Sequence, residues 1–234
     1  MNITIDAAYK NFIEDRKTYV SGKTLAFYLD NISKFITFCH ENYASDWMSD
    51  LPESVLKDYV LHLRTKKKFE GHPFTPESDD FIKNSSVRTY TRAVKSFLNF
   101  CKQEHYIEDY KKVKMPRNDA RQIIPLYAEE VEKIDQTFKI NTMMGLRDFC
   151  IVHLMLDAGF RSQEVINLKI QDVLFDKDAL LVVNSKGSVS RIVIMCPLLK
   201  SRLSRYIYLY RNGSAPTDAV FIQIKTKEPI NENV

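Results

Sequence analysis

One short stretch of the sequence, 157–164, has residue types and spacing suited to binding an anion. It reads Asp-Ala-Gly-Phe-Arg-Ser-Gln-Glu, so Arg161 follows a glycine that fits the end of an apolar helix and precedes a short helix. Glu164 lies one helical turn further along the same face. A guanidinium is a planar fork of donors that matches a phosphate or a carboxylate, and the N–H groups at a helix start add to the attraction. A simpler interpretation stays open, in which Arg161 pairs with Glu164 and only closes the helix junction.

A second candidate is Lys186, which precedes Gly187 in the turn-forming stretch 184–187. Runs rich in β-branched residues flank this stretch, which indicates a strand-to-strand turn. The tip of such a hairpin is mobile and can carry a long side chain into a groove. A lysine that is merely solvated at the turn is the alternative.

The first half of the chain predicts a helical domain. Apolar residues recur at helical spacing in three long segments, and a shorter helix precedes them. The four helices are expected over about 5–19, 21–39, 52–63 and 84–101, with Ser21 or Thr24 as a cap, Pro52 in a first turn and Asn84 or Ser85 as a start. Residues 65–80 combine glycine, prolines and many charges and are predicted to form a loop.

The domain boundary is expected where the helical periodicity is lost, in the stretch 106–125. Pro116 and Pro125 interrupt this stretch, which is otherwise basic. We therefore predict a first domain over 1–115, a linker over 116–125 and a second domain over 126–234.

The second half mixes helix and strand patterns. Helices are expected over 129–138, 145–158, 162–168 and 197–210, and Gly159 suits the cap that ends the second of them. Three runs rich in β-branched residues, 170–174, 179–183 and 189–195, predict an antiparallel meander, and a further short strand is expected over 218–224. The predicted fold class is mainly α, with a small antiparallel three-stranded sheet in the second of two domains.

The composition limits the classes of protein. The 234 residues carry a formal net charge of +4, which permits an acidic partner such as nucleic acid without requiring one. No apolar run is long enough for a membrane-spanning helix, and the first residues lack the pattern of a secretion signal. None of the four cysteines lies within four residues of another, which argues against a metal knuckle and favours reduced core thiols in a cytoplasmic protein.

Taken together, these features resemble the tyrosine recombinases, the phage-integrase family. The family's first box is similar to Gly159, Phe160, Arg161, Glu164, Leu168 and Asp172 after an apolar helix. Its hairpin Lys-Gly, with an arginine five residues after the lysine, is similar to Lys186, Gly187 and Arg191. The first half resembles the family's helical, SAM-like core-binding domain, including its last helix and a basic stretch that reaches Met-Pro at 115–116.

This resemblance implies a site-specific recombinase or integrase that breaks and rejoins double-stranded DNA. A tyrosine attacks the scissile phosphate and forms a 3′-phosphotyrosyl intermediate, and the freed 5′-hydroxyl of a partner strand resolves it without a metal or nucleotide cofactor. The resemblance implies that Arg161 binds the phosphate and that Lys186 protonates the departing 5′-oxygen as general acid. The resemblance also implies that Glu164 supports the position of Arg161.

Two parts of the family pattern are missing. None of the five histidines is followed three residues later by an arginine, so the family's His-x-x-Arg box has no match. Tyr206, Tyr208 and Tyr210 lie on a helix soon after the hairpin and are expected to serve packing or the surface. We therefore expect a truncated recombinase without a nucleophile, which cannot cleave DNA alone. We expect it to be monomeric, whereas the full-length family assembles as a tetramer on paired sites.

Basic residues outside the first box are candidates for DNA phosphate contacts, because the family clamps DNA between its two domains. Such contacts fix position and make binding salt-dependent, but they carry no sequence information. The candidates are Lys66, Lys67, Lys68, Arg88, Arg92, Lys95, Lys111, Lys112, Lys114 and Arg191. A solvated loop is the alternative for 66–68.

Two other functions stay open. A non-catalytic DNA-binding relative would occupy recombination sites and form no covalent adduct. An unrelated two-domain interaction protein would bind its partner independently of salt and would have no affinity for duplex DNA.

Overall fold

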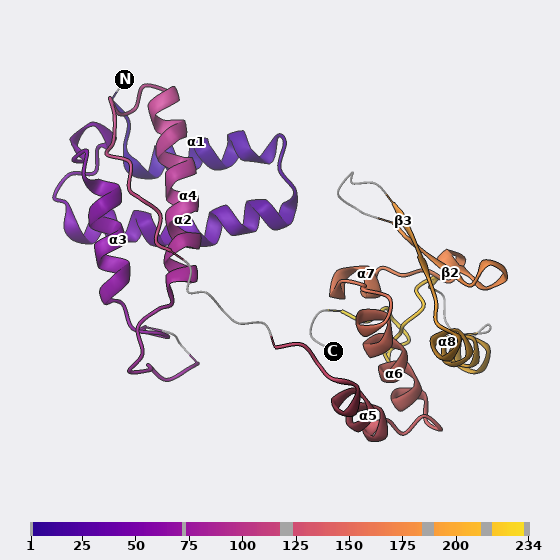
Figure 1. Cartoon of the computed structure of the whole chain (residues 1–234). Coiled ribbons are helices and arrows are strands. Elements are labelled where there is room, and N and C mark those ends of the chain that lie inside the picture. The colour runs from indigo at the N-terminus through magenta and orange to yellow at the C-terminus, as the bar shows by residue number, and fades with distance from the viewer. Residues whose placement is uncertain (1, 72–73, 118–123, 184–189, 212–216, 232–234) are drawn as a thin grey trace. The chain divides into compact units, whose positions relative to one another are not determined.

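The computed structural model describes residues 2–71, 74–117, 124–183, 190–211 and 217–231. The chain divides into two compact units, Met1–Gln122 and Ile123–Val234, which are coloured from indigo to rose and from rose to yellow in Figure 1. Each unit has a separate hydrophobic core.

The first unit contains four α-helices, as the sequence predicts. They are α1 (Ile5–Lys17), α2 (Gly22–Asn42), α3 (Val55–Thr65) and α4 (Asn84–Gln103), with a 3₁₀ turn at Met48–Asp50. Ser21 caps α2, because its hydroxyl accepts a hydrogen bond from the backbone N–H of Thr24 at 3.3 Å. The expected place of Pro52 in a helix is wrong. Its carbonyl accepts from the N–H of Val55 at 2.9 Å in the turn that precedes α3.

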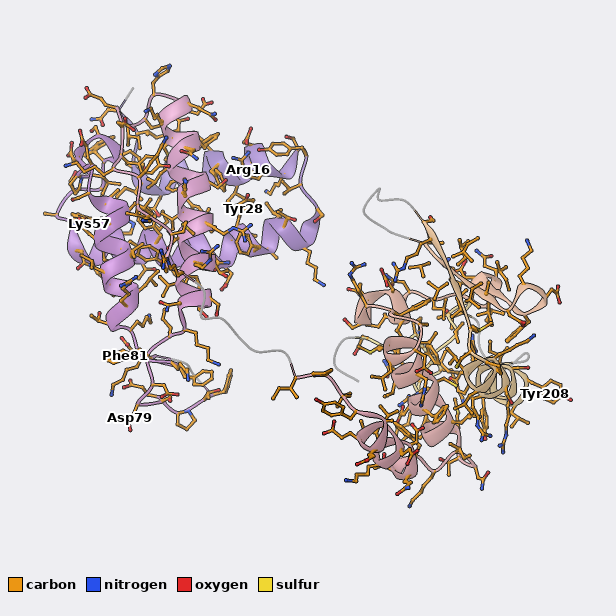
Figure 2. All side chains as sticks on the ribbon, viewed as in Figure 1. Arg16, Tyr28, Lys57, Asp79, Phe81 and Tyr208 are labelled. Atoms are coloured by element: carbon orange, nitrogen blue, oxygen red, sulfur yellow. The ribbon has the colours of Figure 1, made fainter. Side chains whose placement is uncertain are left out.

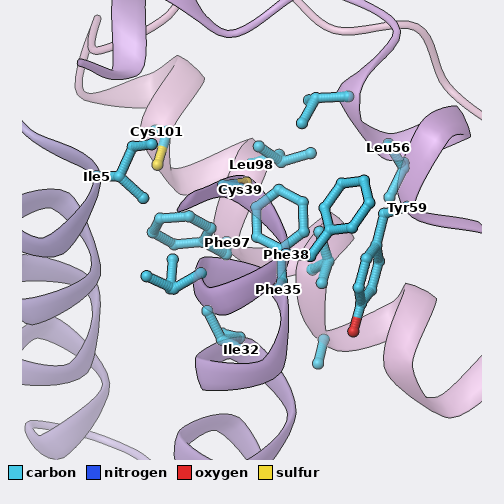
Figure 3. Packing of buried hydrophobic residues seen from close by; sticks show 14 of the residues in the cluster. Ile5, Ile32, Phe35, Phe38, Cys39, Leu56, Tyr59, Phe97, Leu98 and Cys101 are labelled. Carbon is cyan, nitrogen blue, oxygen red and sulfur yellow. The ribbon is translucent and has the colours of Figure 1, made fainter. Parts of the chain in front are cut away.

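Aromatic rings from all four helices form the centre of the first core. Phe97 of α4 packs edge-on against Phe12 of α1, with ring centroids 5.6 Å apart. Phe35 of α2 packs against Phe97 at 6.3 Å and against Tyr59 of α3 at 5.1 Å. Figure 3 shows the rings of Phe35, Tyr59 and Phe97 among aliphatic side chains. Such edge-to-face contacts fix the angles between the helices as well as burying apolar area.

The second unit combines helices with a small sheet. Its elements are α5 (Ala128–Thr137), α6 (Met143–Leu156), α7 (Ser162–Ile166), β1 (Val173–Leu174), β2 (Ala179–Val182), β3 (Arg191–Ile194) and α8 (Pro197–Tyr210). The strands pair antiparallel in the order β1-β2-β3, so the predicted meander and fold class are confirmed. The register places Val182 opposite Arg191 and Leu180 opposite Val193.

Two of the expected strand boundaries are wrong. Residues Ile170–Asp172 form a 3₁₀ turn, because the carboxylate of Asp172 accepts from the backbone N–H of Lys169 at 3.2 Å and bends the chain. Among the described residues, the segment 218–224 forms no ladder and makes only the isolated bridges Lys169↔Ala219 and Ile222↔Pro229.

The second core lies between the sheet, α6 and α8. Leu146 and Leu154 of α6 are wholly buried, as are Leu199 and Leu203 of α8. One face of the meander adds Leu180 and Val182 to this core. In the described ranges, none of the helices has the length and apolar character needed to cross a membrane.

Candidate functional site

Arg161 stands at the junction between α6 and α7, where the backbone turns through Gly159. The φ of Gly159 is +64°, in the left-handed region that glycine adopts without strain. A Cβ at this position would meet no atom within 4 Å, so the backbone conformation, and not crowding, favours glycine here. Arg161 follows in an extended conformation, and its side chain is 77% exposed. The junction therefore presents a guanidinium to solvent at the start of a helix.

Glu164 binds Arg161 in two ways. One carboxylate oxygen accepts from the backbone N–H of Arg161 at 2.9 Å, and the other accepts from its Nη1 at 3.0 Å. The pair that closes the helix junction is therefore present. This ion pair occupies only Nη1 of the guanidinium. The Nε and Nη2 groups of Arg161 have no hydrogen-bond acceptor among the described residues.

Arg191, from the start of β3, binds the same carboxylate. Its Nη1 and Nη2 donate to the two oxygens of Glu164 at 2.9 and 2.7 Å, a bidentate arrangement. Nη2 also donates to the carbonyl of Gly159 at 3.2 Å, and the guanidinium lies 5.9 Å from the ring centre of Phe160. Arg191 thus ties β3 to the junction that carries Arg161.

The electrostatics of this cluster leave an excess of positive charge. Hydrogen bonds from Arg191 and then from Arg161 lower the pKa of Glu164 to about 2, against the opposing effect of burial. The carboxylate, whose side chain is only 7% exposed, is therefore ionised at neutral pH. Two guanidiniums share this single negative charge. The arrangement can attract one further anion to the exposed side of Arg161.

Lys186 lies outside the described residues, as does Gly187. The strands on either side of them are described, with Val182 and Arg191 as the last pair before the connection. The role of Lys186 stays a prediction.

The three tyrosines of α8 have different environments. Tyr206 is wholly buried, and its ring packs 5.6 Å from Phe221 and 5.9 Å from Tyr210. Tyr208 is 72% exposed and projects from α8 in Figure 2. Two of the three therefore contribute to packing, and the third lies on the surface.

The basic residues expected on one face of α4 do not share one environment. Arg88 is half-buried, and its Nη1 donates to the carbonyl of Pro116 at 2.7 Å. Arg92 is exposed and Lys95 is half-buried. Arg88 therefore fastens the segment that follows α4. This role has no signal in the local sequence, because its partner lies 28 residues away.

The run 66–68 is largely paired within its own loop. Lys67 Nζ lies 3.2 Å from a carboxylate oxygen of Glu77 and 3.5 Å from one of Asp79, and Lys68 pairs with Asp80. By contrast, Lys112 and Lys114 are exposed, with no ion pair to a described residue, and Lys111 is 4.0 Å from Glu53. These lysines of the segment after α4 are better placed than Lys67 and Lys68 to meet phosphates.

Sequence reasoning missed a buried histidine between two carboxylates. Nε2 of His153 lies 2.8 Å from an oxygen of Asp135 on α5, and Nδ1 lies 2.8 Å from one of Asp157. The imidazole is 4% exposed and stacks on Phe149 at 4.1 Å. The four-residue spacing of His153 and Asp157 was an available signal for half of this arrangement. Among the described residues, no group of three His, Cys, Asp or Glu side chains is placed to hold a metal ion.

Comparison with known proteins places this site in a family. Residues 125–234, which include Arg161, Glu164 and Arg191, match the model of the phage integrase family. This part of the chain, residues 125–234, belongs to the phage integrase family. The phage integrase match covers the second unit from the start of α5 onward.

Curated tyrosine recombinases align with the first unit as well. The chain is 26% identical to tyrosine recombinase XerA of Pyrococcus horikoshii over 170 residues, which are 69% of this chain and 57% of that protein. It is 24% identical to tyrosine recombinase XerC of Bacillus subtilis over 224 residues, which are 92% of this chain and 67% of that protein. The chain thus spans between 57% and 67% of the lengths of these two relatives.

The fold is shared with an integrase of known structure. A lambda integrase dimer bound to a COC′ core site superposes with a TM-score of 0.68 at 15% identity. The match covers 99% of this chain and 60% of that one.

Proposed function

We propose that this chain is the DNA-binding and phosphate-binding part of a site-specific recombinase that breaks and rejoins double-stranded DNA through a phosphotyrosine intermediate. The observation that carries the proposal is the exposed Arg161, held by a carboxylate that Arg191 also binds, within the phage integrase domain. The lambda integrase structure of the same fold is a complex with core-site DNA, which supports DNA as the partner.

Each residue of the cluster has a role in this proposal. Arg161 donates to a non-bridging oxygen of the scissile phosphate and stabilises the negative charge that grows there during attack. Glu164 fixes the orientation of Arg161. Arg191 neutralises Glu164, so that the carboxylate does not repel the phosphate. Lys186 delivers a proton to the departing 5′-oxygen.

The domains follow from the same proposal. We assign 1–115 to core binding, 116–125 to a linker and 126–234 to the part of the catalytic domain that carries the arginine cluster. We infer that the 234-residue chain by itself does not cleave DNA, because it has no match to the family's His-x-x-Arg box and the tyrosines of α8 serve packing or the surface. We infer that the chain by itself is a monomer in solution. The four free thiols fit a reducing compartment, so we infer a cytoplasmic location.

The test measures duplex binding and covalent capture separately. The chain is titrated with duplex DNA at several salt concentrations, and Arg161→Ala is compared with Arg205→Ala, an exposed arginine of α8 in the same unit. We expect salt-dependent binding that weakens about tenfold in Arg161→Ala and little in the control. Absence of duplex binding at low salt would overturn the proposal.

Covalent capture tests the inactivity of the chain. Incubation with a nicked substrate, which traps phosphotyrosyl intermediates, is expected to give no adduct. An adduct that resists denaturation would show that a tyrosine of this chain is a nucleophile.

A non-catalytic DNA-binding relative is the second candidate, favoured by the internal pairing of Arg161 with Glu164. It predicts that the affinity of Arg161→Ala for duplex DNA stays within about twofold of the unmodified chain, as for an exposed ion pair.

A further inference from the structure

The first unit contains a cavity of about 360 Å³ whose described walls all come from that unit. It is lined by residues of α2, α3 and α4 and of the connection between α3 and α4. Its walls include Lys34 of α2, Tyr59 and His62 of α3, Lys66 and Phe69 of the connection, and Tyr90 of α4.

Tyr59 is one of the residues that line this cavity, and its buried hydroxyl has no hydrogen-bond partner among the described residues. The side chain is 1% exposed, and no described residue comes within hydrogen-bond distance of its oxygen. Figure 3 shows this oxygen at the end of the ring farthest from Leu56 and the hydrophobic cluster. Burial raises the pKa of Tyr59, so the phenol keeps its proton and can donate. Buried polar groups in folded proteins nearly always have a partner, and an orphaned donor in a cavity wall indicates a ligand.

The charge of the walls favours an anion. They carry Lys34, Lys66 and Lys67 against the single carboxylate of Glu70. Lys34 and Lys67 also have acidic partners nearby, in Asp30 at 2.8 Å and Glu77 at 3.2 Å. Lys66 makes no ion pair with a described residue. A half-exposed ammonium of this kind is available to a phosphate.

Aromatic rings line the same space. The ring of His62 lies nearly parallel to that of Tyr59, with centroids 6.4 Å apart. The ammonium of Lys34 already lies over the ring of Tyr90, 5.1 Å from the ring centroid. Phe69 has a φ of +61°, which is unfavourable for a bulky residue, and its side chain is half exposed beside the cavity. Strain of this kind clusters at ligand sites, where it holds a side chain in place.

We propose that this cavity binds a small anion that carries an aromatic ring, with the chemistry of a nucleoside monophosphate. Lys66 binds the phosphate, Phe69 covers the ring, and the hydroxyl of Tyr59 donates to a ring nitrogen or oxygen. The nucleotide comes either free from solution or as an unpaired nucleotide of a DNA strand. This site is independent of the Arg161 cluster, so its failure would leave the duplex-binding test unaffected.

The first test is a titration of the full chain with deoxyadenosine monophosphate, followed by calorimetry. Deoxyadenosine, which lacks the phosphate, and deoxyribose 5-phosphate, which lacks the ring, are titrated in parallel. We expect saturable binding of the monophosphate and binding at least about tenfold weaker for each of the two parts. No saturable binding of the monophosphate, or equal binding of either part, would overturn the proposal.

Two variants with matched controls test the residues. Tyr59→Phe removes only the hydroxyl and is expected to weaken binding about tenfold. Its control is Tyr110→Phe, in which the lost hydroxyl donates to Asn99 Oδ1 at 2.6 Å. Lys66→Gln is expected to weaken binding similarly, and Lys57→Gln, on α3 in Figure 2, is expected to leave it unchanged. Unaltered affinity in both Tyr59→Phe and Lys66→Gln would contradict the assignment.

Thermal unfolding of the ligand-free variants gives an independent readout. Because an unpartnered buried hydroxyl is unfavourable, the midpoint of Tyr59→Phe should equal or exceed that of the unmodified chain, and that of Tyr110→Phe should fall. A lowered midpoint for Tyr59→Phe would show that the hydroxyl already has a partner, and the proposal would be wrong.

Competition distinguishes the two sources of the nucleotide. A duplex with one unpaired adenine and a fully paired duplex of the same length are each added to the chain bound to the monophosphate. Displacement by the first duplex alone identifies a nucleotide of a DNA strand. Displacement by neither identifies the free nucleotide, and equal displacement by both would contradict a site for an unpaired ring.

Discussion

Arg191 binds Glu164 through both terminal nitrogens of its guanidinium, at 2.9 and 2.7 Å, although the two residues are 27 positions apart in the chain. This bidentate pair joins the first residue of β3 to the short helix α7. Because Glu164 also holds the backbone and side chain of Arg161, the position of Arg161 depends on the sheet as well as on its own helix. The carboxylate is therefore the central element of the cluster.

Removing the charge of Glu164 is expected to destabilise the second unit. In Glu164→Gln two guanidiniums lose their shared anion, and an amide can accept at only one of the two positions. We expect the free energy of unfolding in urea to fall by about 2 kcal/mol. Glu132→Gln, at an exposed position of α5, is the matched control and should change by less than about 0.5 kcal/mol. Equal effects in the two variants would show that the carboxylate contributes only as a surface group.

The sequence predicts one half of this cluster and not the other. Arg161 and Glu164 are three residues apart on a helix start, and local spacing is enough to bring them together. The contact of Arg191 with Glu164 depends on strand register and on how the sheet packs beside α7. The local sequence carries no signal for the strand register or for this packing.

The same limit explains the other differences. His153 and Asp157 have helical spacing, but Asp135 reaches the imidazole only because α5 packs against α6. The helix pattern around Pro52 correctly predicts α3, but the turn that delays its start to Val55 is set by a backbone hydrogen bond. Long periodic segments determine which elements form, whereas caps and tertiary contacts determine where they end and what they bring together.

Gly159 is expected to resist substitution by alanine because of its backbone. The left-handed φ of +64° costs an alanine about 1 kcal/mol, although the space around the added methyl group is open. Gly22 is the matched control, because its surroundings are also open and it lies at the start of α2. We expect Gly159→Ala to lower the free energy of unfolding and Gly22→Ala to raise it by a few tenths of a kcal/mol. Similar values for both would contradict a conformational role for Gly159.

His153 is expected to make the stability of the second unit depend on pH. Burial acts to lower its pKa, but hydrogen bonds to Asp157 and Asp135 outweigh this, so the pKa is raised above 6.5. A raised pKa means that the folded chain holds the proton more tightly than the unfolded chain. The stabilisation is therefore complete below pH 6.5 and is lost as the pH rises through the raised pKa. The stabilisation amounts to about 1.4 kcal/mol for each unit by which the folded state raises the pKa of His153.

Urea unfolding at a series of pH values measures this contribution. In His153→Gln the free energy of unfolding should be lower at pH 6 and should lack this part of the decline above pH 6.5. His105→Asn is the control, because His105 is exposed and asparagine accepts its positive φ. If His153→Gln shows the same decline as the unmodified chain, the imidazole does not hold a proton between the two carboxylates.

The salt dependence of DNA binding should distinguish Lys112 and Lys114, in the segment after α4, from the loop lysines Lys67 and Lys68. Lys67 and Lys68 already have carboxylate partners, so a phosphate would gain little from them. Lys112 and Lys114 are exposed and make no ion pair with a described residue, so a phosphate contact there releases counterions. In Lys112→Gln/Lys114→Gln the slope of log K against log[salt] should become less steep by about 0.9 for each lysine that contacts DNA. The double variant Lys67→Gln/Lys68→Gln should keep the slope of the unmodified chain. A less steep slope in the loop variant alone would place the DNA against the loop and contradict contacts by Lys112 and Lys114.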